Sequence, residues 1–240
     1  MFRHIGKTRT FSHNLRIASL LSFVAGLVNV AGFLAVARLT TNVTGHFAFL
    51  VEEVFRLEWI RAFVFFLYIF SFFLGSFVSN IMVEAVSRIN EKYIYSFPVI
   101  LEIGILAGIA LWGESITHPD MVACSLLFSM GLQNSLVTTI SNSVVRTTHL
   151  TGLFTDLGIE FSQLFFYKGV EEKSKLLSSI RLRLTIISFF FIGGIAGGIF
   201  YVSIGMKAFL VTAVVLIAGL VYDTVKFRLI SLKRKLNILP

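Results

Sequence analysis

The chain has 240 residues, of which 56% are hydrophobic and only 14% are charged, whereas soluble domains carry about a quarter charged residues. This composition indicates an integral membrane protein, and the single cysteine, Cys124, excludes a disulfide framework or a cysteine-rich metal site. The net charge of +8 does not predict nucleic-acid binding, because the basic residues lie between apolar runs without interleaved aromatic residues.

Six apolar segments follow one another along the chain: 17–37, 60–83, 95–113, 120–143, 183–205 and 207–225. A helix rises 1.5 Å per residue, so each segment is long enough to cross about 30 Å of hydrocarbon. They are predicted to be helices because an isolated strand cannot satisfy its backbone polar groups in lipid. We therefore predict an all-α fold, with residues 1–240 forming one membrane domain and residues 171–175 forming a solvated loop.

The connecting segments differ in their content of Lys and Arg. If the N-terminus lies inside, all but four of the 21 Lys and Arg residues fall on the inner side; the exceptions are Arg38, Arg56, Arg61 and Lys207. An excess of basic residues marks the cytoplasmic side of a membrane protein. The distribution predicts six spans with both termini in the cytoplasm.

One motif occurs twice, after the first apolar segment and after the fourth. Residues 40–53 and 147–160 align without a gap as T-T-x-x-T-G-x-F-x-x-L-x-x-E, and the copies begin 107 residues apart. Such a repeat indicates a duplication. Three spans separate the copies, so residues 17–113 and 120–225 are predicted to be three-helix repeats of inverted topology, as in many transporters.

Each motif opens a short amphipathic segment, 45–56 in the first half and 152–167 in the second. Both segments are too short to span a bilayer. They either lie flat at opposite interfaces, with the motifs roughly 30 Å apart, or turn back into the protein, with the motifs lining one polar cavity. The sequence leaves both arrangements open.

The motifs place several hydroxyl groups and a glycine at the start of a predicted helix, where free backbone N–H groups attract anions. In the alternative interpretation, Thr44 and Thr151 are simple N-caps and the motifs are structural breaks. Capping does not explain the Thr-Thr pair three residues earlier in each copy. We therefore predict that the motifs supply these substrate- or ion-binding residues: Thr41, Asn42, Thr44, Gly45, His46, Glu53, Thr148, His149, Thr151, Gly152, Asp156 and Glu160.

Four polar residues lie inside apolar segments, namely Asn29, Glu102, Gln133 and Asn134. Polar side chains at such a depth face the helix bundle or a water-filled cavity, and an ionisable one is a candidate functional group. The alternative for the amides is hydrogen bonding between helices, and the alternative for Glu102 is a position close enough to the cytoplasmic end to reach water. All four are added to the predicted binding residues.

Two arginines flank the motifs, Arg38 before the first copy and Arg146 before the second. They are expected either to pair with Glu53, Asp156 or Glu160, or to mark the membrane interface. Arg146 completes the set of predicted binding residues.

The two motif histidines, His46 and His149, do not have the spacing of metal ligands, so no metal site is predicted. Fingerprints of a P-loop, a dinucleotide-binding fold and a nucleophile elbow are missing from the sequence. We expect neither an enzyme nor a bound cofactor.

Small residues recur at helical spacing in two segments. Segment 60–83 contains Ser71, Gly75 and Ser79, and segment 183–205 contains two overlapping G-x-x-x-G patterns, Gly193 with Gly197 and Gly194 with Gly198. Small faces let helices approach closely in lipid. They predict either internal packing or the interface of a homodimer.

Four stretches carry a resemblance to a known family: Gly26-x-x-Asn29 with Gly32-Phe33-Leu34, Thr41-Asn42-Val43-Thr44-Gly45-His46, Gly131-Leu132-Gln133-Asn134, and Val145-Arg146-Thr147-Thr148-His149-Leu150-Thr151-Gly152. Over residues 15–227 the chain resembles the YoaK-type bacterial membrane proteins, a domain of unknown function. The resemblance implies a six-span inner-membrane protein and no particular activity. Members often have Asp where this chain has Asn29, so the resemblance implies no proton carrier at that position.

These features predict a transporter of a small polar molecule or ion, seated in the lipid bilayer of the bacterial inner membrane. Six spans are few to enclose a site, so a second copy of the chain is expected to supply the missing wall. The alternative function is a membrane scaffold or an envelope sensor that transports nothing. A cavity reaching the motifs favours transport, and motifs sealed by packing favour the alternative.

Overall fold

The computed structural model describes residues 10–89, 94–116 and 118–235, without the side chains of 223, 224 and 226–235. Every regular element in this part of the chain is a helix, which confirms the all-α prediction. In chain order the elements are α1 (Phe11–Val36), α2 (Val43–Phe55), α3 (Trp59–Ser87), α4 (Ser96–Trp112), η3 (Gly113–Ser115), α5 (Pro119–Ser141), α6 (Leu150–Gln163), α7 (Val170–Ile204), η4 (Gly205–Lys207) and α8 (Ala208–Lys235).

Five helical stretches of the described residues are long and apolar enough to cross a membrane: Phe11–Val36, Trp59–Ser87, Ser96–Ser115, Pro119–Ser141 and Val170–Tyr222. The last stretch contains α7, η4 and α8, and the chain turns back at Gly205, whose φ of 60° favours glycine. The protein is therefore a multi-pass membrane protein.

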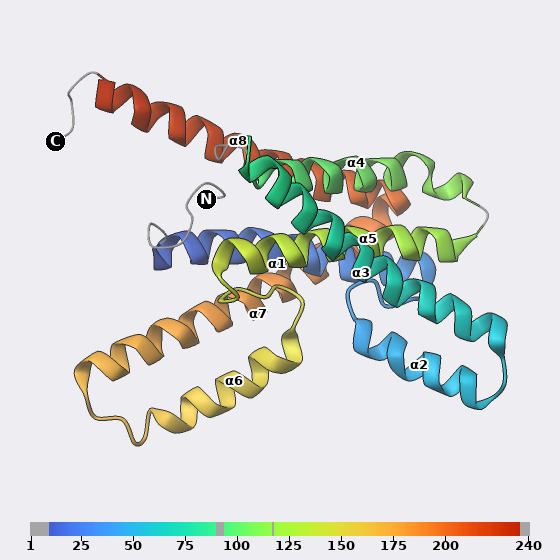
Figure 1. Ribbon diagram of the computed structural model, residues 1–240, viewed down its shortest axis with the longest axis horizontal. Coiled ribbons are helices and arrows are strands. Elements are labelled where there is room, and N and C mark those ends of the chain that lie inside the picture. Colours follow the sequence, from blue (N-terminus) through green and yellow to red (C-terminus); the bar gives the residue numbers. More distant parts are fainter. Residues whose placement is uncertain (1–9, 90–93, 117, 236–240) are drawn as a thin grey trace.

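The long helices alternate in direction along the longest axis of the molecule. In Figure 1, α1, α4 and α7 run from left to right, whereas α3, α5 and α8 run from right to left. Helices α4 and α8 form the upper layer, and the short helices α2 and α6 lie on the lower side. Both short helices begin near the middle of the long axis and run outward to opposite ends.

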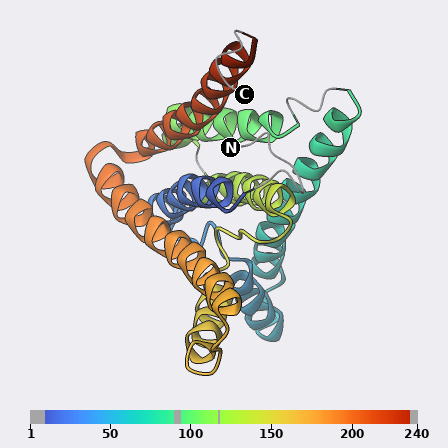
Figure 2. The same ribbon diagram turned by 90° about the vertical axis from the view of Figure 1, so that its left-hand side faces the viewer.

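Helices α1 and α5 form the centre of the molecule, and the two longest apolar helices flank them. Figure 2 shows α3 and α7 as the arms of a V around α1 and α5, with α4 and α8 above. Helix α7 packs along α1, and α3 packs along α5. Only 22% of the most apolar stretch of α3 is buried in the structure, so most of its phenylalanine-rich surface is available to lipid.

Glycines allow these helix pairs to approach until backbone meets backbone. A Cβ atom on Gly26 of α1 would overlap the carbonyl of Phe190 in α7, and a Cβ atom on Gly131 of α5 would overlap the carbonyl of Phe72 in α3. The pattern Gly193-x-x-x-Gly197 likewise faces α1. These small residues serve internal packing, which was one of the two predicted roles.

One predicted loop is helical. Residues 171–175, expected to form a solvated loop, are exposed but lie in the first turns of α7, which begins at Val170. Glu171 and Glu172 lie in the first turn, where the helix dipole favours acidic side chains, and Lys175 pairs with Glu171 at 2.7 Å. Local charge pairing therefore extends the helix beyond the apolar segment.

Candidate functional site

The second threonine of each Thr-Thr pair ties the motif loop to the preceding long helix. Thr41 Oγ1 donates a hydrogen bond to Asn29 Oδ1 of α1 at 2.7 Å. In the second copy, Thr148 Oγ1 donates to Asn134 Oδ1 of α5 at 2.9 Å. The same pair of residue types thus fixes both loops, and this explains why Thr-Thr is repeated and why each preceding helix carries an asparagine.

Gln133 joins the second loop to two helices. Its side chain is fully buried, and its Nε2 donates hydrogen bonds to the Leu21 carbonyl of α1 at 2.9 Å and to Thr147 Oγ1 at 3.4 Å. The predicted alternative for this residue, hydrogen bonding between helices, is the one observed.

The N-cap interpretation of Thr44 and Thr151 is wrong. Helix α2 is capped by Asn42, whose Oδ1 accepts a hydrogen bond from the Gly45 N–H at 3.0 Å, and α6 is preceded by His149. Both threonines lie within the first turn of their helices. Their hydroxyl groups are therefore available for a role other than capping.

Both motifs line one cavity of about 760 Å³. Helices α2 and α6 begin at this cavity, so both motif loops return to the middle of the molecule before the helices run outward. The arrangement with both helices flat at opposite interfaces is therefore wrong. The described lining residues include no Asp, Glu, Lys or Arg; they are Asn29, Leu39, Thr41, Asn42, Val43, Thr44, Gly45, Ala48, Phe72, Thr148, His149, Leu150, Thr151 and Phe190. The cavity is suited to a small polar ligand.

His46 supports the cavity wall and does not line the cavity. Its Nε2 donates a hydrogen bond to the Leu39 carbonyl at 2.5 Å, and its ring centroid lies 4.9 Å from that of Tyr68. Burial is the largest effect on this side chain and lowers its pKa, so the imidazole is neutral with the proton on Nε2. Because Leu39 lines the cavity, the hydrogen bond from His46 holds this loop in place although His46 itself does not line the cavity.

The acidic residues of the second motif pair with a residue of α7. Arg183 Nη2 lies 3.1 Å from Glu160 Oε1 and 3.2 Å from Asp156 Oδ2, and Ser179 Oγ donates to Glu160 at 2.5 Å. Glu160 is only 8% exposed, so this network fastens α6 to α7. The expected pairing of these carboxylates with Arg146 is wrong, since Arg146 is exposed and Arg183 occupies that place.

Glu53 has different surroundings, although it occupies the same motif position as Glu160. It is half-buried and forms no ion pair among the described residues, and its Oε2 has no hydrogen-bond partner there. The expected pairing with Arg38 is therefore wrong, and Arg38 donates instead to the carbonyl of Ala37 at 3.2 Å. The two motifs agree in their threonines and differ in their charges.

The other predicted residues lie outside the cavity. Glu102 is buried in α4, in the upper layer of Figure 1. A Cβ atom on Gly152 would overlap the ring of the exposed His149, which would have to move. Asn134 and Gln133 act on the loop from α5 and do not contact the cavity directly.

Two phenylalanines that line the cavity were missed in the sequence. Phe72 of α3 and Phe190 of α7 each lie three residues before a glycine that packs against α5 or α1. The matching stretches Phe72-Phe73-Leu74-Gly75 and Phe190-Phe191-Ile192-Gly193 could have revealed them. Among 26 phenylalanines this similarity is hard to notice, because the residue is equally common on lipid-facing surfaces.

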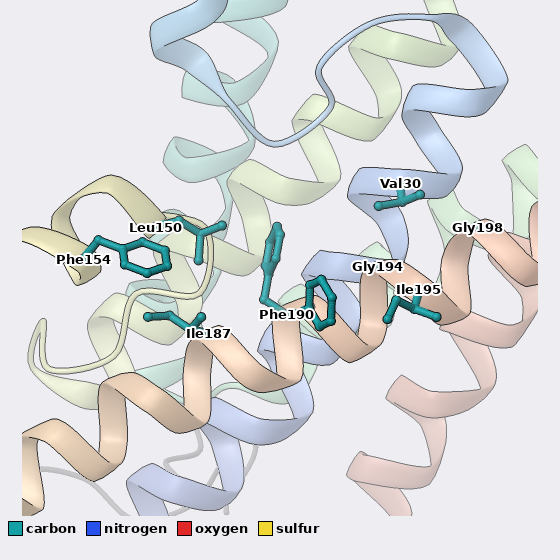
Figure 3. A pocket seen from close by; sticks show the side chains of 9 residues that line it. Val30, Leu150, Phe154, Ile187, Phe190, Gly194, Ile195 and Gly198 are labelled. Atoms are coloured by element: carbon teal, nitrogen blue, oxygen red, sulfur yellow. The ribbon is translucent and has the colours of Figure 1, made fainter. Parts of the chain in front are cut away.

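An apolar pocket of about 490 Å³ adjoins the cavity (Figure 3). Leu150 and Phe190 line both spaces. Figure 3 shows Leu150 and Phe154 of α6 facing Ile187 of α7, so this pocket lies between the short helix and the glycine-rich helix.

Comparison with known proteins identifies one family. A family model described as "Protein of unknown function (DUF1275)" matches residues 17–222, in agreement with the resemblance found in the sequence. No curated protein and no solved structure matches the chain.

Proposed function

The chain belongs to the family of proteins of unknown function DUF1275, and we propose from the geometry of its cavity that it transports a small polar molecule or ion. The observation that carries this proposal is the single cavity that both motifs line. Repeated polar loops that meet inside a membrane protein suit a substrate site at the interface between two repeats.

We further propose six spans in two inverted repeats, with α7 and α8 as separate crossings. The repeat is supported by paired geometry: Asn29–Thr41 in the first half corresponds to Asn134–Thr148 in the second. The glycine contacts described above for α1 with α7 and for α5 with α3 are likewise reciprocal. Such pairs are expected when two equal halves exchange partners around an axis in the membrane plane.

The excess of Lys and Arg supports both termini in the cytoplasm and a bacterial inner membrane as the location. A homodimer is also proposed, because the cavity is continuous with a groove along α2. This groove is lined by Val43, Thr44, Phe47, Ala48 and Val51, three of which also line the cavity. A second copy against α2 would close that side.

Ligand binding can be tested by a thermal-shift screen of purified protein against small polar solutes and inorganic ions. A ligand at about 100 times its Kd stabilises a protein by about 2.7 kcal/mol. Thr151→Val removes a hydroxyl from the cavity and should abolish the shift. Thr155→Val, on the same helix but outside the cavity lining, is the matched control and should retain it.

Transport itself is tested by uptake of the identified ligand into proteoliposomes. Uptake that Thr151→Val removes and Thr155→Val preserves is the expected result. Binding without uptake would favour the alternative function, a membrane scaffold or envelope sensor. A panel without any ligand whose binding depends on Thr151 would contradict the proposed site.

A further inference from the structure

Glu102 is an isolated carboxyl group inside the helix bundle. It lies in α4 with zero exposure, and neither of its carboxyl oxygens has a hydrogen-bond partner in the described part of the chain. Its neighbours on the same face of α4, Val99 and Leu106, are also fully buried. An unpaired carboxylate is strongly disfavoured in such surroundings, so the group needs a bound cation to neutralise it.

Other fully buried oxygen atoms without partners among the described residues lie on helices that contact α4 or each other: Ser22 Oγ on α1, Ser79 Oγ on α3, Ser129 Oγ and Gln133 Oε1 on α5, and Thr212 Oγ1 on α8. Unpaired buried polar groups are rare in folded proteins. None of these residues lines the cavity, so the unpartnered oxygen atoms belong to the helix core and not to the motif site.

The pairing of residues along α4 and α8 shows how far along the bundle axis Glu102 lies. Gly113, which follows α4, lies against Met206, which precedes α8. The two helices are antiparallel (Figure 1) and rise equally per residue, so Glu102 lies opposite about residue 217 of α8.

The contact of α8 with α1 extends this register to two more helices. Gly219 of α8 abuts Leu20 of α1, so the level of Glu102 corresponds to about Ser22. Gln133 of α5 reaches the same level, since its amide donates to the carbonyl of Leu21. Glu102, Ser22 and Gln133 therefore share one layer of the bundle.

Few ionisable groups surround this layer. On the elements packed against α4, the described ionisable side chains are Arg61, Tyr68 and Glu84 of α3, Glu114 of η3, Asp120 and Cys124 of α5, Lys207 of η4 and Tyr222 of α8. None of them is hydrogen-bonded to Glu102. On α5, Cys124 is about two and a half turns away from Gln133.

We propose that Glu102 is a proton-binding site and that the proton is the coupling ion of the transporter. In the structure described here the carboxyl holds its proton, and it releases that proton to water when the layer around it opens. A proton fits better than a metal cation, because neither oxygen has a partner among the described residues and a metal would need a complete shell of oxygen ligands.

Gln133 connects this site to the cavity. Its Oε1 has no hydrogen-bond partner in the described part of the chain, while its Nε2 donates to the Leu21 carbonyl and to Thr147, which begins the second motif. A change in the charge of Glu102 disturbs the layer that holds Gln133, and Gln133 holds the loop that lines the cavity. The coupling part of this inference rests on the proposed transport function, whereas the proton site does not.

The proton site is tested on the full wild-type chain with dicyclohexylcarbodiimide, an apolar reagent that attaches to protonated carboxyl groups. Peptide mass spectrometry locates the adduct. Glu84 of α3 is exposed and serves as the internal control. We expect Glu102 to react at least about tenfold more than Glu84, because an apolar reagent partitions into the apolar surroundings of Glu102 and the reaction requires a protonated carboxyl group.

Labelling of Glu102 should rise as the pH falls and disappear in Glu102→Gln. The amide resembles the neutral carboxyl, so this variant should keep the wild-type melting temperature. If the variant does not fold, the pH dependence of labelling in the wild-type chain still tests the proposal. Absence of label on Glu102 at every pH would overturn the proposal. Labelling that sodium blocks at constant pH would also overturn it, in favour of a metal cation.

Coupling is tested separately in proteoliposomes containing the ligand found by thermal shift. A pH gradient should drive uptake at least about tenfold above exchange in wild type, and Glu102→Gln should lose this gradient-driven uptake. Uptake that ignores the gradient would refute coupling and leave transport standing. Absence of any uptake with clear labelling of Glu102 would refute transport and leave the proton site standing.

Discussion

Replacing Gly26 by alanine tests the packing on which the whole arrangement depends. Gly26 faces the backbone carbonyl of Phe190, and an added Cβ atom would overlap that oxygen. Real Cβ atoms stay more than 3.0 Å from such neighbours, and a backbone carbonyl cannot rotate away as a side chain can. Helices α1 and α7 would therefore have to separate by about 1 Å, a large shift for a close-packed interior.

The expected loss of stability follows from the cost of overpacking. Extra methyl or methylene groups in a packed core cost about 1–3 kcal/mol, and we expect about 3 kcal/mol here because the obstacle is backbone. For a chain of this size, each kcal/mol lowers the melting temperature by about 2–4 °C. Gly26→Ala should therefore melt about 6–12 °C below wild type in detergent, as followed by intrinsic fluorescence.

Gly104→Ala is the matched control, because no atom of the described residues lies within 4 Å of a Cβ atom at that position of α4. Alanine is favoured over glycine in a helix interior by about 1 kcal/mol, so this variant should melt at or above the wild-type temperature. Gly131→Ala should repeat the loss seen with Gly26→Ala, since it meets the carbonyl of Phe72. An unchanged melting temperature for Gly26→Ala would refute this reasoning about helix contact.

Three further changes test other parts of the structure. Gly197→Leu should prevent folding or lower the melting temperature further than Gly26→Ala, since its Cβ would lie 2.5 Å from the Leu27 carbonyl; normal melting would contradict the contact. Arg183→Gln leaves the buried Glu160 without its cation and should lower the free energy of unfolding by about 3 kcal/mol. Arg56→Gln, which breaks the exposed pair with Glu52, should lower it by less than about 1 kcal/mol. Equal losses of stability would show that the pair of Arg183 with Glu160 behaves as an exposed pair. In a Cys124→Ser background, a membrane-impermeant thiol reagent added outside should label Ser115→Cys and miss Lys173→Cys, and the reverse pattern would overturn the proposed orientation.

The helices could be predicted from the sequence because lipid imposes a minimum length on every apolar crossing. Five of the six predicted segments begin within six residues of a helix in the structure. The exception, 183–205, lies inside the longer α7 except for its last residue, Gly205. The additional turns at the start of α7 depend on exposed charge pairs such as Lys175 with Glu171, which a search for apolar segments does not detect.

The threonine motifs and their asparagines could also be predicted, because polar side chains at membrane depth require partners. Their convergence could not, since amphipathicity is equally consistent with a helix lying at the interface and a helix turning inward. The ion pair of Glu160 with Arg183 was missed for a different reason: the two residues come together only because α6 folds back along α7. Arg146 was the expected partner because it is nearer in sequence to the second motif, but in the fold Arg183 lies beside Glu160.

The position of both motif loops inside the molecule has a free-energy cost, which the repeated threonines offset. A loop that returns to membrane depth exposes backbone groups that lipid cannot satisfy, so it is stable only where protein or a water-filled cavity shields it. Thr41 and Thr148 fasten the two loops to buried asparagines, and Asn42 satisfies the Gly45 N–H at the start of α2. Since the first four N–H groups of a helix lack partners within that helix, the remaining groups of α2 and α6 need other acceptors. Both helices begin at the cavity, so water or a ligand there can supply those acceptors.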